Sequence, residues 1–179
     1  MGSACCLLLS LSALLLLHSS SAIPDLTDSA NLVQKVCNKT EDYKSCIQVL
    51  TSSPRTHGAN LTALAHISLD LVKANATATA AYIHRLDKET KEPAMKMRFR
   101  DCRLLYGMSL VDVQRGTVAL VAKDYYETSA RAAAISAEVV ACELAFKEKP
   151  VRKSPLTRQN KYVDLLSNVI VVISNMISV

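Results

Sequence analysis

Apolar residues recur at steps of three and four along most of the chain, which is the spacing of one face of an α-helix. In the segment 61–86 this pattern is carried by Leu64, Ile67, Leu71, Ala74, Ala78 and Tyr82. The segments 94–121 and 125–147 are also helical in pattern, and Pro93 suits the first turn of the earlier one. The last segment, 157–177, has an apolar stripe made of Tyr162, Leu165, Val169, Val172 and Met176. Four long helices are therefore predicted.

Two shorter helices are predicted ahead of these four, at 31–36 and 42–50, with Thr40 as the N-cap of the second. Segments rich in Gly, Pro, Ser or charge separate the helices, at 51–60, 87–93 and 148–156. Because short connections make successive helices antiparallel, the chain is predicted to be all-α: an up-down-up-down four-helix bundle with an N-terminal helical hairpin. Aromatic residues make up only 4% of the chain, which also favours helices over sheets.

The start of the chain has the features of a secretory leader. An apolar run at 7–17 is followed by small residues that end at Ala22, and the run is too short to span a bilayer. We predict a signal peptide at 1–22 and a single secreted domain at 23–179; the alternative is an N-terminal membrane anchor. No membrane span is expected near the C-terminus, because Ser174 and Asn175 interrupt the apolar run there.

Four cysteines lie beyond the leader, and they can pair in three ways: Cys37, Cys46, Cys102 and Cys142. Disulfides are expected rather than a zinc site, because Cys-x-x-Cys spacing is absent and a secreted protein meets an oxidising compartment. If the chain reverses near Ala122, Cys102 and Cys142 lie opposite each other on antiparallel helices. A bond between Cys37 and Cys46 requires a turn at 38–41, since nine residues of straight helix span about 13 Å.

The sequence shows no catalytic constellation. The histidines beyond the leader, His57, His66 and His84, lack His-Glu-x-x-His spacing, and there is no glycine-rich phosphate loop. We therefore predict that the chain is not an enzyme and needs no cofactor or metal. Three Asn-x-Thr sequences are candidate glycosylation sites, at Asn38, Asn60 and Asn75.

Basic residues form two groups, of which one flanks Cys102 and the other follows Cys142: Lys96, Arg98, Arg100 and Arg103, and then Lys147, Lys149, Arg152, Lys153, Arg158 and Lys161. If Cys102 bonds to Cys142, both groups gather at one end of the bundle. This basic pole is expected to make weak contact with an acidic polysaccharide or an acidic protein face; the alternative is a solvated end without a specific partner. Nucleic acid is not an expected partner, because no aromatic residues interleave the charges.

The predicted turn near residue 122 is followed by two adjacent tyrosines. Tyrosine gives a large, rigid contact area and is enriched at binding hot spots. Because neighbouring residues of a helix point about 100° apart, at least one of the two rings is expected to be exposed. The candidate partner-binding residues are Lys123, Asp124, Tyr125, Tyr126 and Glu127. The alternative for Asp124 and Glu127 is a solvated helix start, where acidic groups are favourable.

A set of motifs runs through the chain in a fixed order: Cys37-x8-Cys46, Asp101-Cys102, Ala141-Cys142-Glu143, Phe146-Lys147-Glu148 and Ser154-Pro155-Leu156-Thr157. In this respect the chain resembles the plant invertase and pectin methylesterase inhibitor family over nearly its whole length beyond the leader. The resemblance implies a four-helix bundle with an N-terminal hairpin, and disulfides that join the first cysteine to the second and the third to the fourth. It also implies a secreted protein of the apoplast or cell wall that blocks an enzyme's active site without doing chemistry itself.

The family has two kinds of target, a pectin methylesterase or a cell-wall or vacuolar acid invertase. The resemblance implies that pectin methylesterase inhibitors bind through the bundle helices. Well-known invertase inhibitors insert a Pro-Lys-Phe motif that lies beside the turn between the second and third bundle helices. Residues 123–127 read Lys-Asp-Tyr-Tyr-Glu instead, so a pectin methylesterase is the preferred target. A structural or ligand-carrying bundle is a further alternative, and it predicts an internal apolar cavity of a few hundred Å³, which is about the size of a small ligand site.

Overall fold

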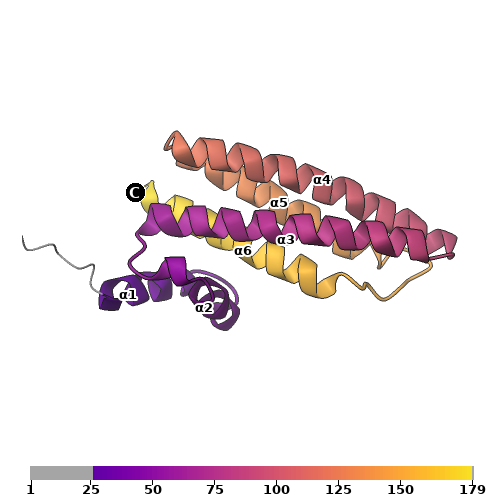
Figure 1. Ribbon diagram of the computed structural model, residues 1–179, viewed down its shortest axis with the longest axis horizontal. Helices are drawn as coiled ribbons and strands as arrows, with labels where there is room; N and C mark the ends of the chain where they lie inside the picture. The colour runs from indigo at the N-terminus through magenta and orange to yellow at the C-terminus, as the bar shows by residue number, and fades with distance from the viewer. Residues whose placement is uncertain (1–25, 179) are drawn as a thin grey trace, which may run out of the picture.

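The computed structural model describes residues 26–178, which form six α-helices (Figure 1). In chain order these are α1 (Leu26–Cys37), α2 (Tyr43–Thr51), α3 (Leu61–Glu89), α4 (Pro93–Val121), α5 (Tyr125–Ala145) and α6 (Thr157–Ile177), with a short 3-10 turn η1 (Pro54–Thr56) after α2. No strand occurs within this range. The predicted signal peptide lies outside the described residues.

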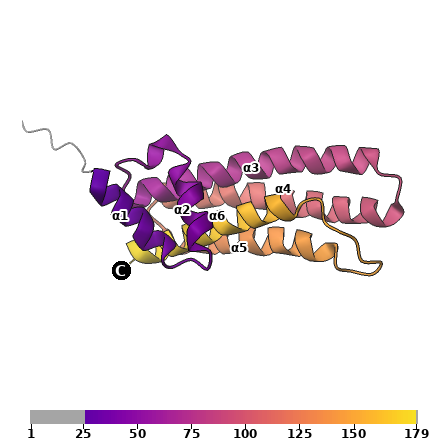
Figure 2. The ribbon, with the colours of Figure 1, turned by 90° about the horizontal axis from the view of Figure 1, so that it is seen from below.

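The four long helices, α3 to α6, pack as an antiparallel bundle in which each contacts two neighbours. α4 lies between α3 and α5, and α6 completes the bundle against α3 and α5. The hairpin of α1 and α2 crosses α6 at one end of the bundle, on the side away from α4 (Figures 1 and 2). The prediction of an all-α, up-down-up-down bundle with an N-terminal hairpin is confirmed.

Both disulfides join the predicted partners. The bond between Cys37 and Cys46 staples α1 to α2, with the Cα atoms 5.5 Å apart. The bond between Cys102 and Cys142 joins α4 to α5, with the Cα atoms 4.8 Å apart. All four cysteines are fully buried, so the disulfides are part of the core.

Helix starts follow the local side-chain chemistry closely. Asn60 accepts a hydrogen bond from the backbone N–H of Ala63 at 2.9 Å and caps α3, while Pro93 occupies the first turn of α4. The prediction that Thr40 caps α2 is wrong. The Thr40 hydroxyl donates to the Cys37 carbonyl at 2.8 Å and so serves the end of α1, and Asp42 caps α2 instead.

The stripe predicted for α6 is only partly right. Val169 is buried as predicted, but Tyr162, Leu165 and Val172 are only half-buried. The other fully buried apolar residues of α6 are Val163, Leu166, Ile170 and Ile173. α6 has apolar residues on two faces because it packs against the bundle and also against the hairpin.

The stripe predicted for α3 is right at its start and wrong farther along. Leu64 and Ile67 are buried as predicted. Ala74 and Ala78 are exposed, whereas Val72, Ala76 and Ile83 are buried.

No helix within residues 26–178 combines the length and the hydropathy that a membrane span needs. The apolar end of α6 belongs to the core, as predicted, because Ile170, Ile173 and Ser174 are buried there.

Candidate functional site

The turn between α4 and α5 is built from a tight helix C-cap. The N–H of Lys123 donates to the Leu120 carbonyl at 3.1 Å, and the N–H of Asp124 donates to the Ala119 carbonyl at 2.9 Å. This pair of bonds is the Schellman motif, which requires a left-handed residue after the helix. Lys123 supplies it with φ 60°, in a region that usually favours glycine.

Asp124 also starts the next helix. Its carboxylate accepts a hydrogen bond from the backbone N–H of Glu127 at 2.9 Å and thereby caps α5. Asp124 therefore caps the C-terminus of α4 with its backbone N–H and the N-terminus of α5 with its side chain. The turn is fixed by its own backbone and presents the start of α5 in one orientation.

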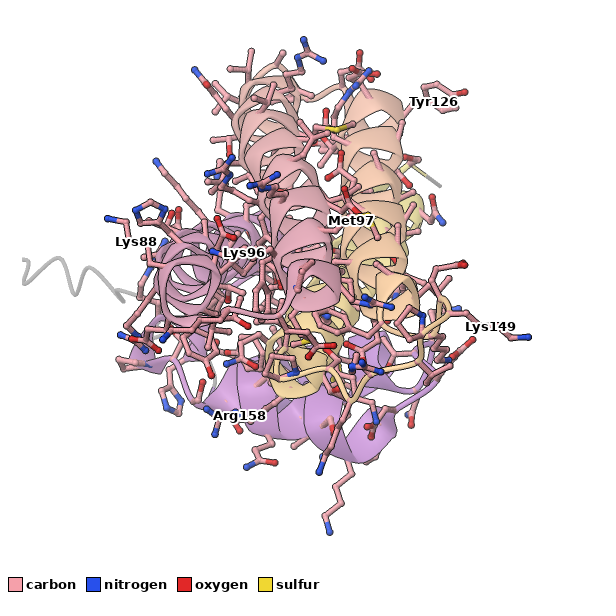
Figure 3. All side chains as sticks on the ribbon, turned by 90° about the vertical axis from the view of Figure 1, so that its right-hand side faces the viewer. Lys88, Lys96, Met97, Tyr126, Lys149 and Arg158 are labelled. Carbon is pink, nitrogen blue, oxygen red and sulfur yellow. A yellow bond between two sulfur atoms is a disulfide. The ribbon has the colours of Figure 1, made fainter. Side chains whose placement is uncertain are left out.

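The two tyrosines after the turn have different surroundings. Tyr126 is 85% exposed and points away from the bundle (Figure 3), whereas Tyr125 is half-buried against the core. The prediction that at least one ring is exposed is therefore confirmed. Lys123 and Asp124 are exposed beside Tyr126.

Glu127 is held in a charged row that connects α5 to α4. Its carboxylate accepts a hydrogen bond from Arg131 Nε at 2.6 Å, and Arg131 Nη1 lies 3.1 Å from Asp112 Oδ1. Farther along, the Ser109 hydroxyl donates to Glu138 Oε2 at 2.7 Å. Burial raises the pKa of Glu138 most, and the negative charge of Asp112 raises it further. These contacts hold α4 and α5 together on the sides where the two helices meet, and they leave the opposite sides of both helices exposed.

Those exposed sides are unusually apolar. Within residues 30–178, where side-chain exposure is described, eleven large apolar side chains are exposed, of which six lie on α4 and three on α5. We call them the outer face: Met97, Leu104, Met108, Val111, Val118 and Val121 from α4, and Tyr126, Val140 and Leu144 from α5. An exposed apolar patch of this kind marks an interaction surface more often than a scattered arrangement does.

The disulfide sets how the two halves of the outer face align. Because α4 and α5 are antiparallel and bonded at Cys102 and Cys142, each step along α4 matches a step back along α5. Leu104 is therefore level with Val140, and Val118 is level with Tyr126. The exposed apolar positions of the two helices therefore lie at matching levels along the pair, as far as the turn.

A shallow hollow of about 390 Å³ lies on the α4 part of the outer face. It is lined by Arg100, Arg103, Leu104, Gly107, Met108 and Val111. Gly107 makes the hollow possible, because a Cβ atom at this position would meet nothing within 4 Å. A helix interior favours alanine over glycine, so an exposed glycine here leaves room for an approaching group.

The sequence analysis missed the outer face, although a signal was present. Met97, Leu104, Val111 and Val118 are spaced seven residues apart. The core residues of α4, such as Phe99, Tyr106 and Val113, have the same spacing two residues later. Two apolar stripes on one helix indicate that it contacts something on both sides.

The basic pole is only partly confirmed. Lys96, near the start of α4, and Lys149, in the loop after α5, lie at the same end of the bundle (Figure 3). However, Arg98 is 1% exposed, and its guanidinium donates to the carbonyls of Ala94, Ala145, Glu148 and Pro150. Arg152 forms an ion pair with Glu92. The sequence shows that Arg98 is charged, and a charged residue was expected to be solvated. It does not show the backbone carbonyls that the fold brings to the guanidinium.

The motifs behind the family resemblance lie in a buried polar network. Glu143 accepts hydrogen bonds from the Thr157 hydroxyl at 2.6 Å and from Asn160 Nδ2 at 2.7 Å. Asn160 Oδ1 in turn accepts one from the Tyr106 hydroxyl at 2.8 Å. Burial opposes the charge on Glu143, yet these donors lower its pKa overall. The network connects α4, α5 and α6, so it stabilises the packing of these three helices.

The predicted glycosylation sites differ in access. Asn38 and Asn60 are exposed, in the α1–α2 turn and at the start of α3 respectively. Asn75 is half-buried within α3, and its Nδ2 donates to the Leu71 carbonyl at 2.8 Å. Glycan occupancy at all three stays a prediction. No cluster of three potential metal-ligating side chains occurs in the described part of the chain.

The described residues define a four-helix bundle with a disulfide-stapled N-terminal hairpin and an exposed apolar helix face. Residues 31–178 match the family model of the plant invertase/pectin methylesterase inhibitors. The chain belongs to this family, and the resemblance found in the sequence is confirmed.

The similar proteins include some named as invertase inhibitors and some named as pectinesterase inhibitors. A protein of Platanus orientalis named "Putative invertase inhibitor" is 33% identical over 144 residues, covering 76% of this chain and 85% of that protein. A "Pectinesterase inhibitor" of Actinidia deliciosa is 26% identical over 164 residues, covering 92% and 89%. The fold matches a crystal structure of a mutant form of a pectin methylesterase inhibitor from Arabidopsis, with a TM-score of 0.74 over 80% of this chain and 95% of that chain, at 24% identity.

Proposed function

We propose that the chain is a secreted, non-catalytic inhibitor that binds a pectin methylesterase one-to-one and covers its active site with the outer face. Membership of a family of enzyme inhibitors supports the general function. The observation that carries the proposed binding mode is the concentration of exposed apolar side chains on α4 and α5.

The outer face has the properties of a protein-binding surface. The hollow over Gly107 is lined by apolar side chains together with Arg100 and Arg103. Arginine and large apolar anchors dominate the binding energy of typical interfaces, and a hollow can receive an anchor from the partner. The exposed ring of Tyr126 extends this surface to the turn.

The turn favours a pectin methylesterase over an invertase. Its residues are Lys123, Asp124 and Tyr125, so the Pro-Lys-Phe motif of invertase inhibitors is missing. The backbone bonds of the Schellman motif also hold this turn closely against the bundle. A partner would therefore meet helix sides more than a projecting loop.

Inhibition of an acid invertase is the second candidate. It is favoured by the 33% identity to the Platanus orientalis protein, whose name refers to invertase. A titration of the oxidised chain against a plant pectin methylesterase and an acid invertase, in parallel at several acidic pH values, chooses between them. We expect near-stoichiometric loss of pectin methylesterase activity. Loss of invertase activity alone would select the second candidate, and no effect on either enzyme would favour a structural or ligand-carrying bundle.

Variants of the outer face test the binding mode. Gly107→Arg fills the hollow from a position where the backbone has open space, so the fold should tolerate it. We expect it to weaken inhibition at least tenfold, and Tyr126→Ala to weaken it severalfold. The matched control is Tyr43→Ala, which removes an exposed tyrosine from α2 on the opposite side of the bundle. Equal inhibition by the parent and by Gly107→Arg would rule out the outer face as the contact.

A further inference from the structure

An open groove of about 870 Å³ is lined by residues of the hairpin and of α6. The hairpin lies against α6 on the side of the bundle away from α4 (Figure 2). Along α6 it extends from Arg158 to Val172, about 20 Å at the rise of an α-helix. Its apolar lining is the half-buried stripe that does not face the bundle, including Tyr162, Leu165 and Val172. The groove is thus separate from the outer face and carries its own aromatic residue.

Three cations line this groove: Lys39 from the α1–α2 turn, and Arg158 and Lys161 from the start of α6. Among the described residues, no carboxylate oxygen lies within 4.0 Å of their side-chain nitrogens. Arg158 and Lys161 were assigned to the basic pole from the sequence, but the fold places them beside Lys39 at the groove. Their charges are available to a ligand.

The carboxylates of the groove are mostly occupied. Asp42 accepts the N–H of Ser45 at 3.0 Å, and Asp164 accepts hydrogen bonds from the Ser136 hydroxyl and from Asn168 Nδ2. Glu41 also lines the groove, so acidic and basic side chains are equal in number. The remaining lining includes the hydroxyls and amides of Thr40, Ser45, Gln48, Ser52 and Asn168.

This mixture of groups restricts the ligand class. A polyphosphate carries more negative charge per length than an oligouronate and would be repelled more strongly by the three carboxylates. A lipid would leave the hydroxyls and amides without partners. A chain of uronic acid units has carboxylates for the cations, hydroxyls for the amides and carboxylates, and apolar sugar faces for the Tyr162 ring. We propose that this groove binds a short acidic oligosaccharide, an oligouronate, independently of the enzyme-binding face.

The proposal is tested with the oxidised full domain by calorimetric titration with hexagalacturonate. We expect saturable binding that weakens with added salt, because exposed charges are screened. Fully methyl-esterified hexagalacturonate and the neutral maltohexaose should bind at least tenfold more weakly. No binding of hexagalacturonate, or equal binding of maltohexaose or of polyphosphate, would overturn the proposal.

Charge-reversal variants locate the site. Arg158→Glu combined with Lys161→Glu should lower the affinity at least tenfold, and Tyr162→Ala should lower it about fivefold. The matched control is Lys147→Glu with Lys153→Glu, which makes the same charge change at exposed positions outside the groove. An equal loss in both double variants would indicate non-specific attraction to the basic pole and overturn the groove assignment. Inhibition should be unchanged in all of these variants, and Gly107→Arg should bind hexagalacturonate normally, so the two proposals fail separately.

Discussion

The two ends of the α4–α5 pair are held together by different means. The bridged end, which comprises residues 98–106 and 142–160, has a disulfide, a buried arginine and the Glu143 network. It also contains an edge-on contact between Phe99 and Phe146, whose ring centroids are 6.0 Å apart. The turn end, which comprises residues 119–131, relies on backbone caps and on the ion pair between Arg131 and Glu127.

The difference separates residues that hold the fold from residues that the fold leaves exposed. Cys142, Glu143 and Thr157, which belong to the motifs of the family resemblance, lie in the bridged end, where Glu143 accepts a hydrogen bond from Thr157. The turn end and the outer face have exposed side chains that the fold does not require, and we propose that the choice of target depends on them.

Removing the disulfide of the bridged end should have the largest effect. Cys102→Ala with Cys142→Ala opens a loop of 40 residues, and the loop-entropy model gives a loss of about 4 kcal/mol in the free energy of unfolding. The matched pair Cys37→Ala with Cys46→Ala opens a loop of nine and should cost about 2.7 kcal/mol. Urea denaturation measures both losses. A smaller loss for the first pair would show that the remaining contacts of the bridged end hold α4 and α5 together without it.

Arg98→Met should come next, with a loss of about 3 kcal/mol in the free energy of unfolding. The methionine keeps much of the buried stem, but four backbone carbonyls lose their charged donor. The control is Arg100→Met on the exposed side of α4, which should change stability by less than about 0.5 kcal/mol. Similar results for the two variants would mean that water replaces the guanidinium easily and that the bridged end is not organised by Arg98.

The sequence allowed most of the helices and both disulfides to be predicted. Caps and breakers such as Asn60 and Pro93 act locally, so they are visible without the fold, and cysteine spacing gives the pairing once a turn is assumed. The burial of Arg98 could not be predicted, because its partners are carbonyls that come together only when the chain has folded. In α3 the predicted stripe is right at Leu64 and wrong at Ala74 and Ala78, because an alanine side chain is too small to show from the sequence which face it lies on.

The candidate site was predicted in part. The exposure of at least one of Tyr125 and Tyr126 followed from the geometry of adjacent helical residues, which requires no tertiary information. Only the fold shows that the exposed ring is that of Tyr126. The outer face could not be predicted from the sequence, because an apolar residue such as Leu104 has the same local pattern whether it faces the core or the solvent. Leu104 is 67% exposed in the fold. Only the packing of α4 against α3 and α5 decides which of its two stripes is buried.

Two glutamates should give opposite pH dependences of stability. The pKa of Glu143 is lowered in the fold, so its contribution is present above the unfolded value of about 4.3 and is lost as the pH falls. The pKa of Glu138 is raised, so its contribution is complete below about 4.3 and is lost as the pH rises through the folded pKa. As the pH rises from about 2 to 7, Glu143→Gln should therefore lose stability relative to the parent mainly below about 4.3, and Glu138→Gln should gain stability relative to the parent mainly above about 4.3.

Urea denaturation at several pH values across this range measures both slopes. The comparison needs both variants, because each alone could reflect a change in net charge. Both substitutions remove one negative charge, so a general charge effect would shift them in the same direction. Parallel slopes would contradict the assignment of Glu143 to a donor-rich site and of Glu138 to a desolvated site beside Asp112.

The smallest effects are expected at two glycines of α4. Gly107→Ala should raise the free energy of unfolding by about 0.5–1 kcal/mol, because a helix interior favours alanine and the added Cβ has open space. Gly116→Ala should give a gain of similar size, since its Cβ would lie 3.4 Å from Arg131 Cβ and 3.6 Å from Leu69 Cδ2, in ordinary contact. Only Gly107 lies on the outer face, so only Gly107→Ala should weaken inhibition, and by less than Gly107→Arg. Urea denaturation and enzyme titration of the two variants together separate stability from binding, because a loss of inhibition in both would have to arise from the altered helix and not from the hollow.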